Sequence, residues 1–336
     1  MWNYFHIKTD TDHTIRYAIG VKEDELNLDK INRFIVFFNG RTQWIELNSK
    51  ILDDLDLSED TAILTMDHRG QGDSGGKRAS IDSYSTFVKD SKFLIDKIIG
   101  EKPYMIMSHS MGGLITLYGC INKVFTPKSL ILVSPLIRLP KYRIVHHIVR
   151  LLYPLRHLGV SRLLSNILNS VSLKYETNTL THSYKYFNEV KHSPYPVPAP
   201  DLDWLHASMK ASSFILDTRN LTQLLNIPLC MIVAEKEQVV DKKTFRFWFD
   251  KLEGLKNQYR IQIRSSHQPI TDNPSQSFDF PKIVDQFFTI GGAYHEILTE
   301  EDHYRNQAIK IINNWFTITE FNNSTTTKPD PLDKVG

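Results

Sequence analysis

A serine between a strand pattern and a helix pattern is the first candidate for chemistry. Ser110 lies in the segment Ser108–Gly113 (S-H-S-M-G-G), directly after an apolar run and directly before a helical pattern. A nucleophile elbow needs this context, because a sharp turn lifts the hydroxyl above the sheet and small neighbours let strand and helix approach. Ser108 stands where such a motif usually has glycine. The motif alone leaves two interpretations equally open, a nucleophilic Ser110 or a serine that caps the helix.

A second segment could stabilise negative charge. Asn39-Gly40-Arg41 follows an apolar run that ends at Phe38. The backbone N–H groups of Arg41 and Met111 would then point at the oxyanion that forms when a serine attacks a carbonyl carbon. Taken alone, Asn-Gly is more typical of an ordinary turn. The prediction depends on the amides and not on the side chains.

An acid follows in the chain order that such a serine site requires. Glu237 comes shortly after the apolar run 229–233 and competes with Glu235 and Asp241. Glu235 is very near the strand end, and Asp241 is typical of a helix N-cap. We therefore predict Glu237 as the acid, since either carboxylate type can serve.

His295 is the predicted base. It lies between the last predicted strand and the last amphipathic helix, and it comes after the serine and the acid in the chain. His109, His267 and His303 are the alternatives among 13 histidines, and chain order favours His295. We see no spacing typical of zinc ligands, and the chemistry needs neither a metal nor a cofactor.

The segments around these residues predict an α/β fold. Short apolar runs alternate with longer amphipathic segments, which is typical of a mostly parallel central sheet flanked by helices. The predicted strands are 34–38, 62–66, 104–107, 130–133, 229–233 and a run near 287–290.

The alternation of predicted strands and helices stops after Pro135. A long segment with helical patterns of its own follows, too long for a simple connection. We interpret residues 136–226 as an inserted helical cap, and residues 1–135 and 227–318 as the core. The proline-containing stretch 257–281 is expected to be a surface loop, and the polar tail 319–336 is expected to be disordered.

Composition excludes several classes of protein. The chain of 336 residues has 40 Lys and Arg against 38 Asp and Glu, a formal charge of +2, which argues against a nucleic-acid partner. The N-terminus does not resemble a secretory signal, and no apolar run has the length of a membrane span. Cys120 and Cys230 lie in apolar segments typical of a core. We expect a cytoplasmic protein.

With these segments, the chain resembles the monoglyceride-lipase-like branch of the α/β hydrolases, and within it the bacterial lysophospholipases. The resemblance extends from about Phe34 to Phe316. The segments that carry it are Phe38–Arg41, Asp67–Gly75, the Ser110 elbow, the stretch around Glu237, Gly292–Leu298, Asn178–Ser183 and Pro198–Trp204. The family implies Ser110, Glu237 and His295 as a catalytic triad and Asp67–Gly75 as a scaffold. Ser108 and Asn39 depart from its usual glycine and histidine.

The resemblance implies a serine esterase that cleaves lysophospholipids or monoacylglycerols. Two alternatives use the same fold, an acyltransferase with the same triad and a peptidase that removes N-terminal residues. A peptidase needs an acidic site for the substrate amine, and Leu136–Tyr175 contains no Asp or Glu. An inactive binding protein is a third alternative, which the presence of all three triad residues disfavours.

One helix of the expected cap is basic and amphipathic. Arg143, His146, His147 and Arg150 share one face, and Ile144, Ile148, Leu151 and Leu155 share the opposite one. Such a helix could lie on an anionic membrane, as a peripheral contact at the inner face. It could equally pack its apolar face on the sheet domain, or its cations could pair with a lipid phosphate.

Overall fold

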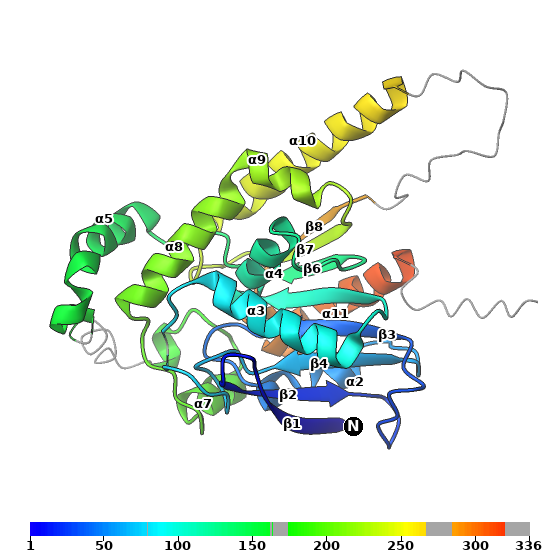
Figure 1. Ribbon diagram of the computed structural model, residues 1–336, viewed down its shortest axis with the longest axis horizontal. Coiled ribbons are helices and arrows are strands. Elements are labelled where there is room, and N and C mark those ends of the chain that lie inside the picture. Colours follow the sequence, from blue (N-terminus) through cyan, green and yellow to red (C-terminus); the bar gives the residue numbers. More distant parts are fainter. Residues whose placement is uncertain (79, 162, 164–173, 267–283, 320–336) are drawn as a thin grey trace, which may run out of the picture.

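One sheet of eight strands organises the part of the chain that the structure describes (Figure 1). The computed structural model describes residues 1–78, 80–161, 163, 174–266 and 284–319. The strands are β1 (Trp2–Lys8), β2 (Thr14–Gly20), β3 (Arg33–Phe38), β4 (Thr61–Met66), β5 (Tyr104–His109), β6 (Leu130–Val133), β7 (Leu229–Ala234) and β8 (Gln286–Ile290).

The strands lie in the order β1-β2-β4-β3-β5-β6-β7-β8. β2 pairs antiparallel with both β1 and β4, whereas β3 to β8 are mutually parallel. The predicted mostly parallel sheet is therefore confirmed. The carboxyl ends of the parallel strands meet at one edge, where ligands bind in open α/β sheets.

Helices cover both faces of the sheet (Figure 1). The α-helices are α1 (Ile45–Asn48), α2 (Ile51–Asp54), α3 (Tyr84–Leu94), α4 (Met111–Ile121), α5 (Tyr142–Leu152), α7 (Tyr184–Lys191), α8 (Leu202–Leu216), α9 (Thr218–Leu221), α10 (Lys243–Ser266) and α11 (Asp302–Ile318). The shorter helical turns are η1 (Ile95–Ile99), η2 (Tyr153–Leu158), η3 (Tyr175–Thr177), η4 (Thr222–Leu224) and η5 (Ile297–Thr299).

Side chains of each strand alternate between two cores, because successive residues point to opposite faces of a sheet. In β3, Phe34, Val36 and Phe38 belong to one core, and Ile35 and Phe37 belong to the other. Residues of α3, α4, α8 and α10 complete the first core, and residues of α2 and α11 complete the second. Burial on both faces explains why the parallel strands are continuous apolar runs.

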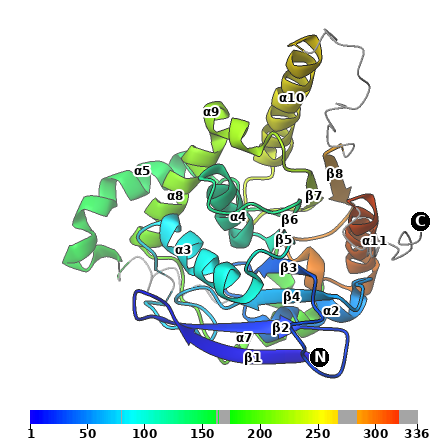
Figure 2. The same cartoon turned by 45° about the vertical axis from the view of Figure 1, so that its right-hand side comes forward.

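The segment 136–226 lies between β6 and β7. Its described residues form helices and helical turns and contain no strand. α8 packs against α3, α4 and α5, and α5 lies on the far side of α8 from the sheet (Figure 1 and Figure 2). This arrangement is compatible with an inserted cap, whose limits at 136 and 226 stay a prediction.

The helix α10 corrects one expectation from the sequence. It continues to Ser266, so 257–266 is helical and does not belong to a surface loop. The segment is polar but contains no proline, so nothing in it stops the helix. The rest of that expected loop, 267–281, and the tail from 320 lie outside the described residues. No described helix combines the length and apolar character that crossing a bilayer requires.

Candidate active site

Ser110 occupies a strained turn between β5 and α4. Its φ of 50° and ψ of −115° lie in a region that residues with a side chain rarely adopt. Three backbone hydrogen bonds hold it there. The Ser110 amide donates to the Val133 carbonyl at 3.0 Å, and the Ser110 carbonyl accepts from Gly113 at 3.0 Å and from Leu136 at 2.8 Å. This geometry is that of a nucleophile elbow.

Two glycines after Ser110 let α4 approach its neighbours. A Cβ atom at Gly112 would lie 2.2 Å from the Phe38 carbonyl oxygen, and one at Gly113 would lie 2.6 Å from the Pro135 side chain. Both distances are too short for any side chain. Ser108, two residues before Ser110, is buried, and its hydroxyl has no hydrogen-bond partner among the described residues. The serine therefore fits in the glycine position without displacing the strand.

The three predicted triad residues meet at the carboxyl edge of the sheet. His295 Nε2 lies 2.9 Å from Ser110 Oγ, and His295 Nδ1 lies 2.7 Å from Glu237 Oε2. The Glu237 carboxylate also accepts backbone hydrogen bonds from Val239 at 2.7 Å and Val240 at 3.1 Å. All three triad side chains are buried. A hydroxyl, an imidazole and a carboxylate thus form one continuous hydrogen-bonded chain.

The competing acids lie elsewhere. Glu235 is exposed and accepts a hydrogen bond from the Gly292 amide at 2.7 Å. Asp241 accepts from the Lys243 amide at the start of α10, at 3.2 Å, as a helix cap does. Neither carboxylate contacts His295.

The competing histidines do not reach Ser110 either. His109 is buried with its ring centroid 4.9 Å from that of His295, but its Nε2 lies 3.2 Å from the His295 carbonyl oxygen. His303 is exposed on α11, and His267 lies outside the described residues.

The loop after β3 and the N-terminus of α4 each carry one of the two predicted oxyanion donors. The amides of Arg41 and Met111 belong to residues that line the same cavity as Ser110. Within the described residues, no protein acceptor engages either amide. Asn39 anchors the loop, since its side chain donates to the Met66 carbonyl at 2.9 Å and accepts from Asn48 at 2.6 Å. Asn39 therefore has a structural role in this loop.

The scaffold predicted at Asp67–Gly75 supports this loop. Gln71 accepts a hydrogen bond from the Thr42 amide at 2.8 Å, and His68 Nε2 lies 3.2 Å from the Asn39 carbonyl. Asp67 accepts from the Ile45 amide at 2.9 Å. None of the lining residues of the Ser110 cavity comes from this segment, so its Asp, His and Ser residues hold the site from outside.

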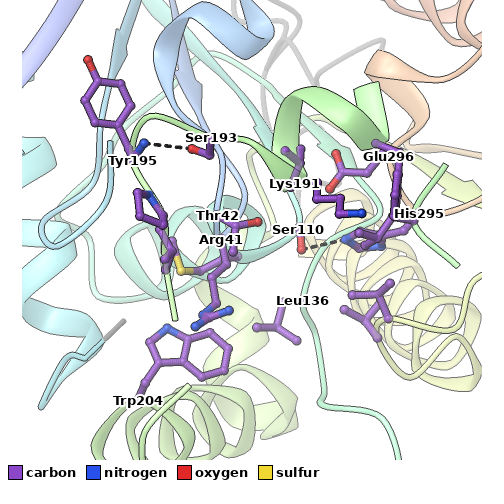
Figure 3. Close-up of a pocket in the computed structure, with 18 of the residues that line it drawn as sticks. Arg41, Thr42, Ser110, Leu136, Lys191, Ser193, Tyr195, Trp204, His295 and Glu296 are labelled. Carbon is purple, nitrogen blue, oxygen red and sulfur yellow. Dashed lines mark hydrogen bonds between the residues drawn. The ribbon is translucent and has the colours of Figure 1, made fainter. Parts of the chain in front are cut away.

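Ser110 and His295 open onto a cavity of about 520 Å³ (Figure 3). The wall is mainly apolar, with polar groups close to Ser110. Its lining comprises Arg41, Thr42, Ser110, Met111, Leu136, Leu139, Leu180, Phe187, Val190, Lys191, Ser193, Tyr195, Pro196, Val197, Trp204, Val239, Val240, His295 and Glu296. Leu180 to Trp204 come from the expected cap, so the cavity lies between that segment and the sheet edge.

A family model described as serine aminopeptidase, S33, matches residues 29–274, which is more than half of the chain. The matched range includes Ser110 and Glu237. The chain belongs to this family.

Two known proteins that are similar to this chain have the names of lipid ester hydrolases. A Haemophilus influenzae protein named probable lysophospholipase L2 is 23% identical over 299 residues, covering 86% of this chain and 85% of that protein. Rat monoglyceride lipase is 32% identical over 81 residues, covering 23% of this chain and 27% of the relative.

A solved structure shares the fold over nearly the whole chain. Saccharomyces cerevisiae monoglyceride lipase, in complex with a substrate analog, aligns with a TM-score of 0.64 at 16% identity and covers 94% of both chains. The predicted α/β-hydrolase fold, the resemblance to the monoglyceride-lipase-like branch and the assignment as an enzyme are confirmed.

The electrostatics of the triad favour a charged His295 imidazole beside an ionised Glu237. Burial opposes the cation of His295, but the Glu237 carboxylate and its hydrogen bond outweigh this effect and raise the pKa of His295. Burial likewise opposes ionisation of Glu237, whereas the His295 cation and the two backbone amides favour it, so the pKa of Glu237 is lowered. His109 Nδ1 lies 3.9 Å from the Glu296 carboxylate, but burial and the neighbouring His295 cation lower the pKa of His109 to about 3.

Sequence reasoning missed Glu296. Its carboxyl is buried, lines the cavity and accepts a hydrogen bond from Gln43 at 2.6 Å. Burial raises the pKa of Glu296 to about 7. Its place directly after His295 was the only signal, and neighbouring positions do not indicate which way a side chain turns.

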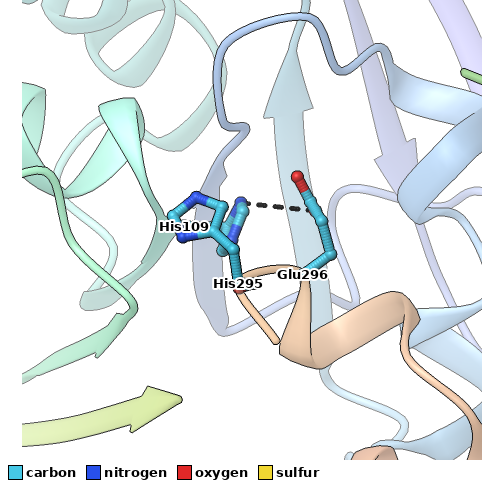
Figure 4. A group of neighbouring side chains, drawn as sticks. All are labelled: His109, His295 and Glu296. Carbon is cyan, nitrogen blue, oxygen red and sulfur yellow. Dashed lines mark hydrogen bonds and ion pairs between the residues drawn. The ribbon is translucent and has the colours of Figure 1, made fainter. Parts of the chain in front are cut away.

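Glu296, His109 and His295 have ligand atoms close enough to hold a metal ion (Figure 4). However, both ring nitrogens of His295 are already engaged, one by Ser110 and one by Glu237. The arrangement therefore suits a proton relay better than a metal centre.

Proposed function

We propose that this chain is a serine ester hydrolase that cleaves the carboxylic ester of single-chain lipids, lysophospholipids or monoacylglycerols, through an acyl-enzyme on Ser110. The observation that carries the proposal is the hydrogen-bonded chain Ser110–His295–Glu237 at the wall of a mainly apolar cavity. The names of the relatives support the same substrate class.

Acyl transfer proceeds in two halves. His295 Nε2 takes the proton of the Ser110 hydroxyl, and Ser110 Oγ attacks the ester carbonyl. The backbone amides of Arg41 and Met111 stabilise the oxyanion, and Glu237 holds the imidazole in the required tautomer and stabilises its cation. His295 then protonates the leaving alcohol. In the second half, His295 activates a water molecule that releases the fatty acid and regenerates Ser110.

The lining of the cavity favours an acyl lipid over a peptide. Removal of N-terminal residues needs a carboxylate to bind the substrate ammonium, and Glu296 is the acid among the lining residues. Burial raises its pKa to about 7, which weakens its negative charge at neutral pH, and Gln43 already donates to it. Two cations, Arg41 and Lys191, also line the cavity and would repel an ammonium group.

We also propose that the protein is cytoplasmic and contacts the anionic inner face of the membrane through α5. The packing of α5 argues against the alternative in which its apolar face covers the sheet domain. Ile144, Ile148 and Leu155 are exposed, and Leu151 is 74% exposed. Arg143, His147 and Arg150 on the adjoining faces are exposed as well, which suits an anionic lipid surface. Binding to anionic vesicles tests this contact.

A hydrolysis screen tests the catalytic proposal. The full chain is assayed for fatty acid release from lysophosphatidylethanolamine and 1-monoacylglycerol, and for cleavage of a p-nitrophenyl ester and an aminoacyl p-nitroanilide. We expect ester cleavage, with a loss of about ten-thousandfold or more in kcat for Ser110→Ala. Ser134→Ala changes a buried serine directly after β6 and is the matched control.

Two results would contradict the proposal. Cleavage of the anilide without ester cleavage would make the chain a peptidase, and full activity of Ser110→Ala would exclude Ser110 as nucleophile. Transfer of the acyl group to a second lysolipid, measured by product analysis, would make it an acyltransferase with the same triad.

A further inference from the structure

The side chain of Arg41 is held at the cavity wall by two contacts. Arg41 Nη2 donates a hydrogen bond to the Pro198 carbonyl, and the guanidinium lies over the Trp204 ring, 5.3 Å from its centroid. Figure 3 shows the guanidinium beside Trp204, on the other side of Ser110 from His295. The side chain is therefore oriented before any substrate binds.

This guanidinium has unused hydrogen-bond donors, and no carboxylate of the described residues pairs with it. Its Nε is inaccessible to solvent and has no hydrogen-bond partner among the described residues. The hydrogen bond to Pro198 engages one of its five N–H groups. No described carboxylate forms an ion pair with it. Asp201, whose charge acts on Arg41, pairs with Lys77 at 2.9 Å and caps α8 through the Trp204 amide.

Enclosing a cation without a partner costs free energy. Burial lowers the pKa of Arg41 to about 10, so the side chain still carries its charge at neutral pH. The buried arginines of the described residues, Arg16 and Arg69, are instead paired with carboxylates, as Arg69 is with Asp90 at 2.6 Å. An uncompensated, oriented guanidinium at the wall of a substrate cavity fits an anionic group of the ligand, and its planar fork matches a phosphate.

Arg41 also has a fixed place relative to the reacting ester. In the proposed function, its backbone amide donates to the oxyanion, so its side chain starts beside the scissile carbonyl. A glycerol unit separates the ester carbonyl of a lysophospholipid from its phosphate, a length comparable to the Arg41 side chain. The two ends of one residue can therefore contact the two polar groups of one substrate.

We propose that the Arg41 guanidinium binds the phosphate of a lysophospholipid head group, so that the enzyme prefers lysophospholipids to neutral monoacylglycerols. This inference rests on the proposed function and specifies its substrate class. The shared chemistry is the phosphodiester, whatever alcohol it carries.

Substrate preference in Arg41→Gln tests the inference. We measure kcat/KM for lysophosphatidylethanolamine, lysophosphatidylglycerol and 1-monoacylglycerol, all with the same acyl chain. The ratio of each lysophospholipid to monoacylglycerol should fall about tenfold or more, because a charge-assisted bidentate contact is lost only with the phosphate substrates. Arg41→Lys should retain part of the preference, since it keeps the charge but not the fork.

Arg138→Gln is the matched control. Arg138 also stacks on an aromatic ring, that of Tyr142 at 5.4 Å, and pairs with Asp241, but it does not line the cavity. In Arg138→Gln, the ratio of kcat/KM for each lysophospholipid to that for monoacylglycerol should equal the wild-type ratio. Glycerol 3-phosphate gives a second readout that does not depend on lipid turnover. It should inhibit hydrolysis of the p-nitrophenyl ester by the wild type and about tenfold less by Arg41→Gln.

The outcomes separate the two proposals. An equal loss on all three lipids in Arg41→Gln, with unchanged inhibition by glycerol 3-phosphate, would overturn the phosphate contact and leave the esterase intact. An effect on only one lysophospholipid would also overturn it, because both carry the phosphate. A wild type that cleaves no lipid ester would contradict the proposed function itself.

Discussion

The helices α4 and α5 have the same length of 11 residues and opposite surroundings. In α4, ten residues are buried, including residues on every side of the helix. In α5, Val149 is the one buried residue, while an apolar face and several basic side chains are exposed. α4 begins directly after Ser110, and α5 lies beyond α8 from the sheet (Figure 2).

The difference in burial indicates different roles. α4 holds Ser110 in position, whereas α5 exposes a surface that a partner could contact. A helix packed on all sides has one position, so the elbow at its N-terminus can hold Ser110 Oγ at hydrogen-bond distance from His295. A helix held by one face leaves its other residues free for a partner. The triad should therefore respond to single-atom changes, whereas α5 should respond to changes in surface charge and apolar area.

The largest effect on the triad, apart from loss of the nucleophile, is expected for Glu237→Gln. The variant removes one charge and keeps the size of the side chain, so the imidazole loses the partner that stabilises its cation and fixes its tautomer. We expect kcat to fall about ten-thousandfold, measured on the p-nitrophenyl ester.

Glu235→Gln is the control for this prediction. It makes the same chemical change on the same loop, at an exposed carboxylate that contacts the Gly292 amide. Its activity should stay within about threefold of the wild type, as expected for a surface change of roughly 0.5 kcal/mol. A larger loss in Glu235→Gln than in Glu237→Gln would assign the acid to Glu235 instead.

Charge reversal on α5 should give the next largest effect, on membrane binding rather than on catalysis. Each basic residue near an anionic membrane contributes about 1 kcal/mol, so Arg143→Glu with Arg150→Glu should weaken binding to phosphatidylglycerol vesicles by about thirtyfold or more. Ile148→Ser with Leu151→Ser should also weaken it. Vesicle sedimentation measures both.

The control for α5 is Phe247→Ser, which removes another exposed apolar side chain, 51% exposed, from α10. Its vesicle binding should be that of the wild type. Turnover of the soluble p-nitrophenyl ester should be unaltered in all three α5 and α10 variants. Vesicle binding that does not change in either α5 double variant would exclude α5 as the membrane contact.

The same contrast explains what the sequence could predict. The strands β3 to β7 were found because both of their faces are buried, which leaves a continuous apolar signal. The edge strand β8 was found from its short apolar run, although it is only partly buried. β1 and β2 were not predicted. Both mix apolar with polar or charged residues, such as Lys8 in β1 and Arg16 in β2, and much of β1 is exposed at the sheet edge. The extension of α10 over 257–266 was missed because polar composition was taken for a loop.

The candidate site was predictable where local context defines it. Ser110 lies in a nucleophile-elbow motif between a strand pattern and a helix pattern. Glu237 and His295 each follow a predicted strand, in the chain order that the triad requires. Arg41 was chosen for its backbone amide, and nothing in the sequence indicated that its guanidinium would be enclosed without a carboxylate. Such features depend on which cap residues face the sheet edge, here Pro198 and Trp204, and that is decided by packing over long sequence distances.

The pH dependence of kcat/KM should follow His295. Only the neutral imidazole can accept the proton of Ser110, and Glu237 raises the pKa of His295 above its ordinary value of 6.5. Activity should therefore decline about tenfold per pH unit below a midpoint that lies above 6.5. In Glu237→Gln this midpoint should move to lower pH, because the stabilising charge is gone. A midpoint unmoved by the substitution would mean that another group controls the acid limb.

The smallest effect is expected for Ser108→Gly, which restores the usual residue of the elbow. The Ser108 hydroxyl is buried and has no partner among the described residues, so its removal relieves an unsatisfied group. Glycine in a strand costs roughly 0.5–1 kcal/mol of stability, which offsets the gain. We expect kcat/KM within about threefold of the wild type and thermal unfolding within a few degrees. A tenfold gain in kcat/KM would mean that Ser108 distorts the elbow, and that even a fully packed helix such as α4 leaves room for the nucleophile to be misplaced.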